Sequence, residues 1–136
     1  MVERSKDWLN QAERDIKQAE ASLRDGFYEW ACFAAQQASG KSVKALIQVL
    51  GGDVWCHSVT ALIDAVPEGV RPDHLRDKAL ELDQAYIPSR YPNAHPVGFP
   101  GRFSQPVDRD SDFVLPYLRL WFLHQFIRSL RLSNPA

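Results

Sequence analysis

The segment from residue 27 to residue 50 constrains the fold more than any other part of the sequence, because its apolar and small residues occupy more than one helical face. These residues are Trp30, Ala31, Phe33, Ala34, Ala35, Ala38, Val43, Ala45, Leu46, Ile47 and Val49. A helix that is apolar around most of its circumference is typical of the centre of a bundle. Gly51 and Gly52 predict its end, whereas Gly40 weakens its interior by about 1 kcal/mol relative to alanine and needs a packing reason.

An amphipathic helix is predicted before this central segment. Its apolar residues recur at helical spacing, with charged residues between them: Trp8, Ala12, Ile16, Ala19 and Leu23. Ser5 or Asp7 is expected to cap its start, and Gly26 is expected to end it. So short a connection to the central helix predicts that the two helices are antiparallel neighbours.

Three further helices are predicted, from Ser58 to Val66, from about Asp73 to Tyr86 and from about Leu115 to Leu130. Regular helix is excluded between the last two by five prolines: Pro88, Pro92, Pro96, Pro100 and Pro106. No segment alternates in the manner of a strand. The predicted fold class is therefore all-α: one domain, residues 1–136, forming an antiparallel up-and-down bundle of four to five helices with a long Pro-rich loop before the last helix.

Composition limits the classes of function. The formal net charge of -1 argues against a surface that attracts nucleic acid everywhere, so any RNA contact is expected to be local. Cys32 and Cys56 are too few for a disulfide framework and fit small buried side chains in a reducing cytoplasm. The histidines and cysteines lack ligand-like spacing, so no metal and no cofactor are expected. Polar residues interrupt the apolar segment from Phe113 to Leu132, and no basic-then-apolar leader is present, so we expect a cytoplasmic protein with no membrane span.

Arg90 and His95, with four residues between them, are the most chemically informative pair. An arginine stays charged and can bind two phosphate oxygens at once, whereas a histidine titrates near neutral pH and can accept or donate a proton. Together these two groups could cleave RNA without a metal. The spacing alone occurs by chance in many proteins, so the hypothesis depends on the surrounding sequence.

Four stretches of the chain together resemble the HEPN domain family, in its small prokaryotic branch. They are Gly26–Tyr28, Phe33–Leu46, His57–Ser58 and Tyr86–Pro92. The resemblance covers about Lys6 to His95 and implies an all-α antiparallel bundle that is usually a homodimer. It also implies a gene often paired with a minimal nucleotidyltransferase. In the ribonuclease members an arginine, a short spacer and a histidine form the catalytic motif, which maps here onto Arg90 and His95.

The resemblance leaves two functions open. One is a metal-independent endoribonuclease that acts as the toxin-like component of a toxin–antitoxin or defence module, with the transferase as antitoxin. The other is a non-catalytic homodimeric module that binds a nucleotide, RNA or the partner nucleotidyltransferase. In the first, His95 would assist attack of an RNA 2′-hydroxyl on the adjacent phosphate, and Arg90 would stabilise the charge that builds on the phosphoryl oxygens. The product would carry a 2′,3′-cyclic phosphate.

Four other residues are candidates for substrate contact. Tyr91 could stack on a base, and Asn93 could donate a hydrogen bond to a phosphate or orient the histidine. Lys41 and Lys44 fall near one helical face and could contact phosphates if that face lines a cleft. Both lysines also fit solvated side chains with no ligand.

Each member of the catalytic pair has a structural alternative. Arg90 could stabilise the fold by pairing with a carboxylate such as Asp83, or by capping carbonyls at a helix end. His95 could be a solvated histidine in a Pro-rich loop.

Overall fold

The computed structural model describes residues 4–84, 86, 91–94 and 96–98. All of the regular secondary structure in these residues is helical, which confirms the all-α class. No helix among them combines the length and the apolar character that crossing a bilayer requires. The helix predicted from Leu115 to Leu130 lies outside the described residues, as does part of the Pro-rich loop.

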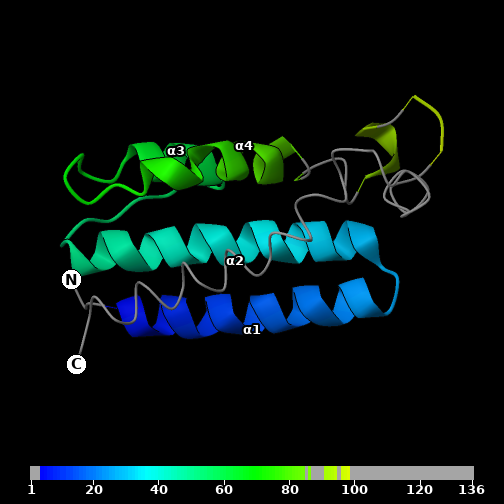
Figure 1. The fold of residues 1–136 in the computed structure, drawn as a ribbon, viewed down its shortest axis with the longest axis horizontal. Coiled ribbons are helices and arrows are strands. Elements are labelled where there is room, and N and C mark those ends of the chain that lie inside the picture. The colour runs from blue at the N-terminus through cyan, green and yellow to red at the C-terminus, as the bar shows by residue number, and fades with distance from the viewer. Residues whose placement is uncertain (1–3, 85, 87–90, 95, 99–136) are drawn as a thin grey trace.

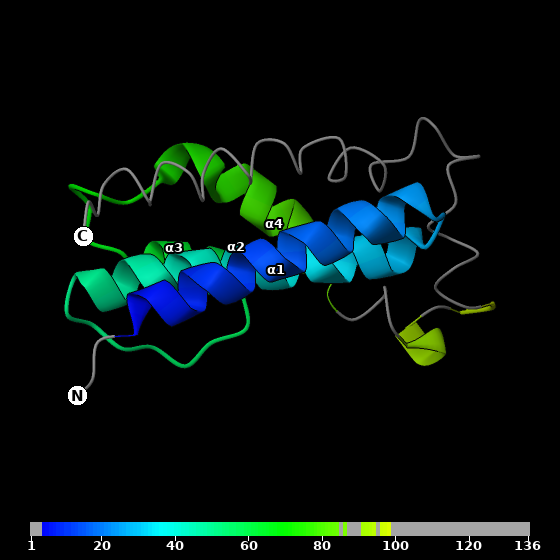
Figure 2. The ribbon, with the colours of Figure 1, turned by 90° about the horizontal axis from the view of Figure 1, so that it is seen from below.

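The helices form two layers around one central helix. α1 (Ser5–Arg24) and α2 (Tyr28–Val49) run antiparallel and side by side (Figures 1 and 2). The shorter α3 (Val59–Asp64) and α4 (Arg76–Gln84) pack on the other side of α2 (Figure 1). α2 is therefore covered on both sides, as its apolar circumference predicted.

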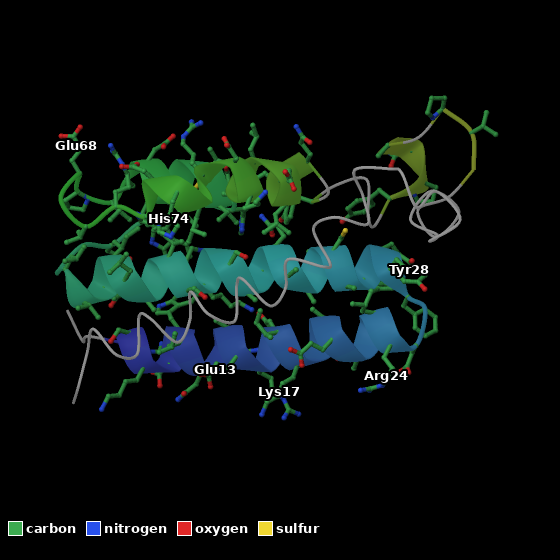
Figure 3. All side chains as sticks on the ribbon, in the orientation of Figure 1. Glu13, Lys17, Arg24, Tyr28, Glu68 and His74 are labelled. Carbon is green, nitrogen blue, oxygen red and sulfur yellow. The ribbon has the colours of Figure 1, made fainter. Side chains whose placement is uncertain are left out.

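α1 buries an apolar stripe against α2. Its buried side chains include Ala12, Ile16 and Ala19, which pack with alanines of α2, while Glu13 and Lys17 point away from α2 (Figure 3). Small side chains on both helices let the two backbones approach closely.

The predicted cap of α1 is wrong. The helix begins at Ser5, so Arg4 occupies the cap position, and no side chain accepts a capping hydrogen bond there. Ser5 is buried in the first turn. The Asp7 carboxylate accepts instead from Arg4 Nε at 2.9 Å. The Asp7 carboxylate, which was predicted to cap the helix, is thus engaged by Arg4.

Both long helices end at a glycine in the left-handed region, as predicted. Gly26 has φ +86° after α1, and Gly51 has φ +81° after α2. The Phe27 N–H donates to the Ser22 carbonyl at 2.8 Å, and the Gly52 N–H makes the equivalent bond to the Ile47 carbonyl at 2.9 Å. These are Schellman ends, which satisfy the last carbonyls of each helix and turn the chain sharply.

The second layer is shorter than predicted. α3 begins at Val59, with Ser58 as its cap: the Ser58 hydroxyl accepts from the Ala61 N–H at 3.1 Å. The helix predicted from Asp73 opens with a 3-10 turn, η1 (Asp73–Leu75), before α4 begins. Both short helices pack on the C-terminal half of α2 through a separate apolar cluster: Val43, Ile47, Val59, Leu62, Ile63, Val66, Leu75 and Ala79.

Candidate functional site

Arg90 and His95 lie outside the described residues, but the turn between them is described. η2 (Pro92–Ala94) is a single 3-10 turn. In it the Ala94 N–H donates to the Tyr91 carbonyl oxygen at 3.2 Å. The residue after the arginine and the residue before the histidine are therefore joined by one hydrogen bond.

The two substrate-contact candidates of this turn are open to solvent. Tyr91 is 47% exposed, and Asn93 is also exposed. η2 lies beyond the end of α4, toward the end of the molecule where α1 and α2 connect (Figure 1).

The two candidate lysines contact α1. Lys41 Nζ lies 2.6 Å from the Asp15 carboxylate, and the two side chains are only 24% and 17% exposed. Lys44 Nζ lies 5.1 Å from the centre of the Trp8 ring, in a cation–π contact. Burial lowers the pKa of Lys44; the Cys56 thiol opposes this effect, and the Lys41 charge adds to it. Both lysines therefore take part in the contact between α1 and α2. Neither of these contacts involves a residue of η2.

A groove of about 590 Å³ follows the same seam. It is lined by Asp15, Gln18, Ser22, Phe27, Trp30, Phe33, Ala34, Gln37 and Lys41. Its aromatic side chains include Phe27 and Trp30, which are 56% and 49% exposed, and its charged side chains are the paired Asp15 and Lys41. A groove of this size and lining suits a small organic ligand or an apolar segment.

A hydrogen-bonded junction centred on Asp83 links α2, α3 and α4. The carboxylate accepts from Ser58 Oγ at 2.8 Å, from the Val59 N–H at 2.8 Å and from the Thr60 N–H at 2.9 Å. Gln36 Nε2 donates to the same carboxylate at 3.2 Å. A side chain of α4 thus satisfies the first amides of α3, which have no partner within that helix.

These donors decide the charge of Asp83. Partial burial opposes ionisation of the carboxyl group, but the hydrogen bonds from Thr60, Val59 and Ser58 outweigh it and hold the pKa of Asp83 below its usual value. The carboxylate is therefore ionised at neutral pH. Amide and hydroxyl donors stabilise this negative charge. The predicted pairing of Asp83 with Arg90 falls outside the described residues.

A row of aromatic rings runs from the groove to the turn before α3. Trp30 and Phe33 meet edge to face with ring centres 6.0 Å apart, and Phe33 lies 6.1 Å from Tyr86. Tyr86, in the turn after α4, lies nearly parallel to the His57 ring at 6.2 Å and 13°. Such offset ring contacts stabilise a pair by about 0.5–1.5 kcal/mol beyond burial. The row therefore holds Tyr86 in place immediately before the segment that carries Arg90.

Neither the junction nor the ring row was predicted from the sequence. A signal for the junction was present: Gln36 stands among buried alanines of α2, and a buried amide requires partners. Gln36 Nε2 donates to the His57 carbonyl oxygen at 2.7 Å and to Asp83, and Gln36 Oε1 accepts from Gln37 Nε2 at 2.9 Å. The sequence offered no comparable signal for the contact between His57 and Tyr86, because the two residues are far apart in the chain.

No metal site emerges from the described part of the chain. Nowhere in residues 4–84, or in the shorter described segments after them, do three His, Cys, Asp or Glu side chains gather as metal ligands do. Cys32 and Cys56 are not joined in a disulfide; the first is buried and the second partly buried.

Comparison with known proteins identifies the family. The HEPN domain model matches residues 5–111. The structure of TT1696 from Thermus thermophilus is 39% identical, with a TM-score of 0.76 over 92% of this chain and 99% of that one. ST0689, an archaeal HEPN homologue, is 34% identical with a TM-score of 0.67, over 93% of this chain and 99% of that one.

A third solved structure agrees. The HEPN domain protein tm0613 from Thermotoga maritima is 31% identical, with a TM-score of 0.62 over 94% of this chain and 98% of that one. A search of curated proteins gave no match. The matched family model covers most of the chain, and the relatives are aligned over nearly their full length. The chain belongs to the HEPN domain family.

Proposed function

We propose that this protein is a metal-independent endoribonuclease in which Arg90 and His95 carry the chemistry. Membership of the HEPN family supports a nuclease or nucleotide-binding role in general. The observation that carries the finer proposal is the η2 turn, in which a hydrogen bond of 3.2 Å joins Tyr91 to Ala94. One tight, exposed turn between an arginine and a histidine suits a site that must admit an RNA phosphate between two side chains.

The reaction needs no metal because the substrate supplies its own nucleophile. The His95 imidazole removes the proton from a ribose 2′-hydroxyl, and the oxygen attacks the adjacent phosphorus. The Arg90 guanidinium binds the phosphoryl oxygens as negative charge builds on them. The products are a 2′,3′-cyclic phosphate and a free 5′-hydroxyl. DNA, which lacks the nucleophile, is inert.

The proposal includes a homodimer that brings two such motifs together, and a role as the toxin-like half of a module with a nucleotidyltransferase. Tyr91 and Asn93 are the preferred substrate contacts, because both side chains are exposed. Lys41 and Lys44 remain secondary contacts, because each already has a partner on α1.

The test is cleavage of a short single-stranded RNA by purified protein in excess chelator. We expect a 2′,3′-cyclic phosphate product, and a loss of about 100-fold or more in rate for Arg90→Ala and for His95→Ala. His74→Ala is the matched control. It also removes a histidine, but His74 lies in the turn before α4, outside the proposed motif (Figure 3). Cleavage that survives both substitutions of the pair would overturn the assignment.

One observation favours the second candidate function, a non-catalytic binding module. The groove beside Trp30 and Phe33 has the volume of a ligand site. This module would bind nucleotide, RNA or the transferase without cleaving RNA, and Trp30→Ala would weaken binding. Calorimetric titration with nucleotides, run beside the cleavage assay, separates the two functions.

A further inference from the structure

The groove between α1 and α2 changes in chemical character along its length. At one end Lys41 of α2 pairs with Asp15 of α1 at 2.6 Å. The two helices are antiparallel, so later residues of α1 lie beside earlier residues of α2 (Figure 1). Gln18 and Gln37 therefore come next along the groove, and Trp30 lies nearer the end where the two helices connect. The groove has an ion pair at one end, two carboxamides along its length and aromatic rings at the other end.

The charges of the groove are already satisfied. Of the residues that line it, Asp15 and Lys41 are the charged ones, and their paired side chains are only 17% and 24% exposed. The Asp15 carboxylate also accepts from Gln11 Nε2 at 2.9 Å. A phosphate or carboxylate could take Lys41 only by leaving this carboxylate without its cation, which is costly for a largely buried pair. The lining therefore favours an uncharged ligand.

The aromatic end of the groove suits a flat ring. Phe27 and Trp30 are 56% and 49% exposed, so both rings are accessible. Trp30 meets Phe33 edge to face at 6.0 Å, a contact that holds its ring in one orientation. Planar bases stack on aromatic side chains of this kind with little regard to their sequence.

The two carboxamides present hydrogen-bond acceptors. Gln18 Nε2 donates to Ser22 Oγ at 3.0 Å, and Gln37 Nε2 donates to Gln36 Oε1 at 2.9 Å. Gln36 is buried and itself donates to Asp83, so the Gln37 side chain is positioned by the Asp83 junction. Neither Gln18 Oε1 nor Gln37 Oε1 accepts a hydrogen bond from the described residues. A ligand with N–H donors on its edge would satisfy both oxygens.

We propose that this groove binds a nucleobase by its ring and its amino group, without contact to phosphate. The ring stacks on Trp30, and the amino group donates to the carbonyl oxygens of Gln18 and Gln37. Adenine meets these requirements, because it is uncharged at neutral pH and carries an amino donor. The proposal deepens the second candidate function and involves neither Arg90 nor His95. The base could belong to a free nucleoside or to an unpaired position of an RNA strand, since both present the same ring.

Calorimetric titration with two matched nucleosides tests the recognition of the amino group. Inosine has a carbonyl oxygen where adenosine has its amino group, and that oxygen would face the two glutamine acceptors. We expect inosine to bind about 10-fold more weakly than adenosine. Adenosine 5′-monophosphate should bind like adenosine, with little change in affinity between about 50 mM and about 200 mM salt, because no phosphate contact releases counterions.

Substitutions in the groove test the location of the site. Trp30→Ala should weaken adenosine binding by about 10-fold or more, whereas Trp30→Phe keeps a ring and should retain most of the affinity. Gln37→Leu removes one acceptor and should reduce the preference for adenosine over inosine. Trp55→Ala is the matched control, because Trp55 is 93% exposed and does not line the groove. Thermal unfolding of each variant checks that the fold is intact.

A short oligoadenylate separates the two sources of the base. Affinity equal to that of adenosine indicates a free nucleoside. Tighter binding that is still lost in Trp30→Ala indicates an unpaired base of RNA. Both results support the proposal.

Three results would overturn the proposal. The first is a wild type that binds neither adenosine nor oligoadenylate. The second is equal affinity for adenosine and inosine, or adenosine binding that survives Trp30→Ala. The third is much tighter binding of the monophosphate with a steep salt dependence. RNA cleavage is measured separately on the Arg90 and His95 variants, so any of these results leaves the ribonuclease proposal standing. A protein that binds adenosine but cleaves no RNA would support the second candidate function alone.

Discussion

At the scale of single residues, the strongest organising feature is one carboxylate. Asp83 receives donors from Gln36, Ser58, Val59 and Thr60, so three helices depend on its charge. The sequence suggested Asp83 as a partner for Arg90. Arg90 lies outside the described residues, so that pairing stays a prediction. The partners that are described were not predicted, because the amides at the start of α3 lie within reach of Asp83 only after the chain has folded.

Replacing Asp83 by asparagine tests this dependence. The pKa of Asp83 is below its ordinary value of about 3.9. The ionised group therefore stabilises the fold above that pH, and this contribution is lost as pH falls through the folded-state pKa. Asp83→Asn should lower the free energy of unfolding by about 1–3 kcal/mol at pH 7, with a smaller difference below about pH 4.

Urea denaturation across this pH range provides the measurement. Asp53→Asn, the same change at an exposed loop position, is the matched control and should have little effect at any pH. A difference between Asp83→Asn and wild type that stays constant down to acidic pH would show that shape, and not charge, is what the junction requires.

At the scale of elements, the glycines of α2 and its connections have opposite roles. Gly26 adopts φ +86°, where an alanine is strained. Gly40 has ordinary helical geometry, and a Cβ placed on it would meet Leu62 and Val59 at 3.7 and 3.9 Å, which is normal contact. The close approach of α3 therefore does not require a glycine at position 40.

These two positions predict opposite effects of the same substitution. Gly26→Ala should destabilise the protein by about 1–2 kcal/mol, the cost of a left-handed non-glycine residue. Gly40→Ala should stabilise it by up to about 1 kcal/mol through helix propensity. Thermal unfolding of both variants measures the difference, and a destabilised Gly40→Ala would contradict the conclusion that α3 leaves room for a Cβ at position 40.

The sequence was sufficient for elements whose signals are local. The apolar circumference of α2 predicted a central helix, and Gly26 and Gly51 predicted where the long helices end. It failed where a partner distant in the chain decides the outcome. Asp83 caps α3 from another helix, and the His57 contact with Tyr86 also joins residues far apart in the chain. The predicted cap of α1 failed for a local reason, because Arg4 pairs with the Asp7 carboxylate three residues away.

At the scale of the whole molecule, the described surface retains large exposed apolar side chains. Phe27, Trp30 and Trp55 are 56%, 49% and 93% exposed. Phe27 and Trp30 line the same groove, and neighbouring exposed aromatic residues are typical of surfaces that meet another molecule. They support the proposed homodimer, in which two motifs would share one substrate.

The homodimer predicts a solution mass of twice the 15.5 kDa chain. Light scattering coupled to size exclusion should give that value, and the midpoint of thermal unfolding should rise with protein concentration, because association stabilises the folded state by mass action. A concentration-independent midpoint together with the mass of one chain would contradict the dimer.

The length of α3 has a consequence for how this protein opens. A helix of six residues cannot persist by itself in water. Its first amides are held by Asp83 of α4, so α3 exists only while α4 is docked. Amide hydrogens of the two helices should therefore exchange with solvent in a single opening event, slower than a frayed end and faster than α2. Opening of that unit would therefore separate Ser58, Val59 and Thr60 from the Asp83 carboxylate.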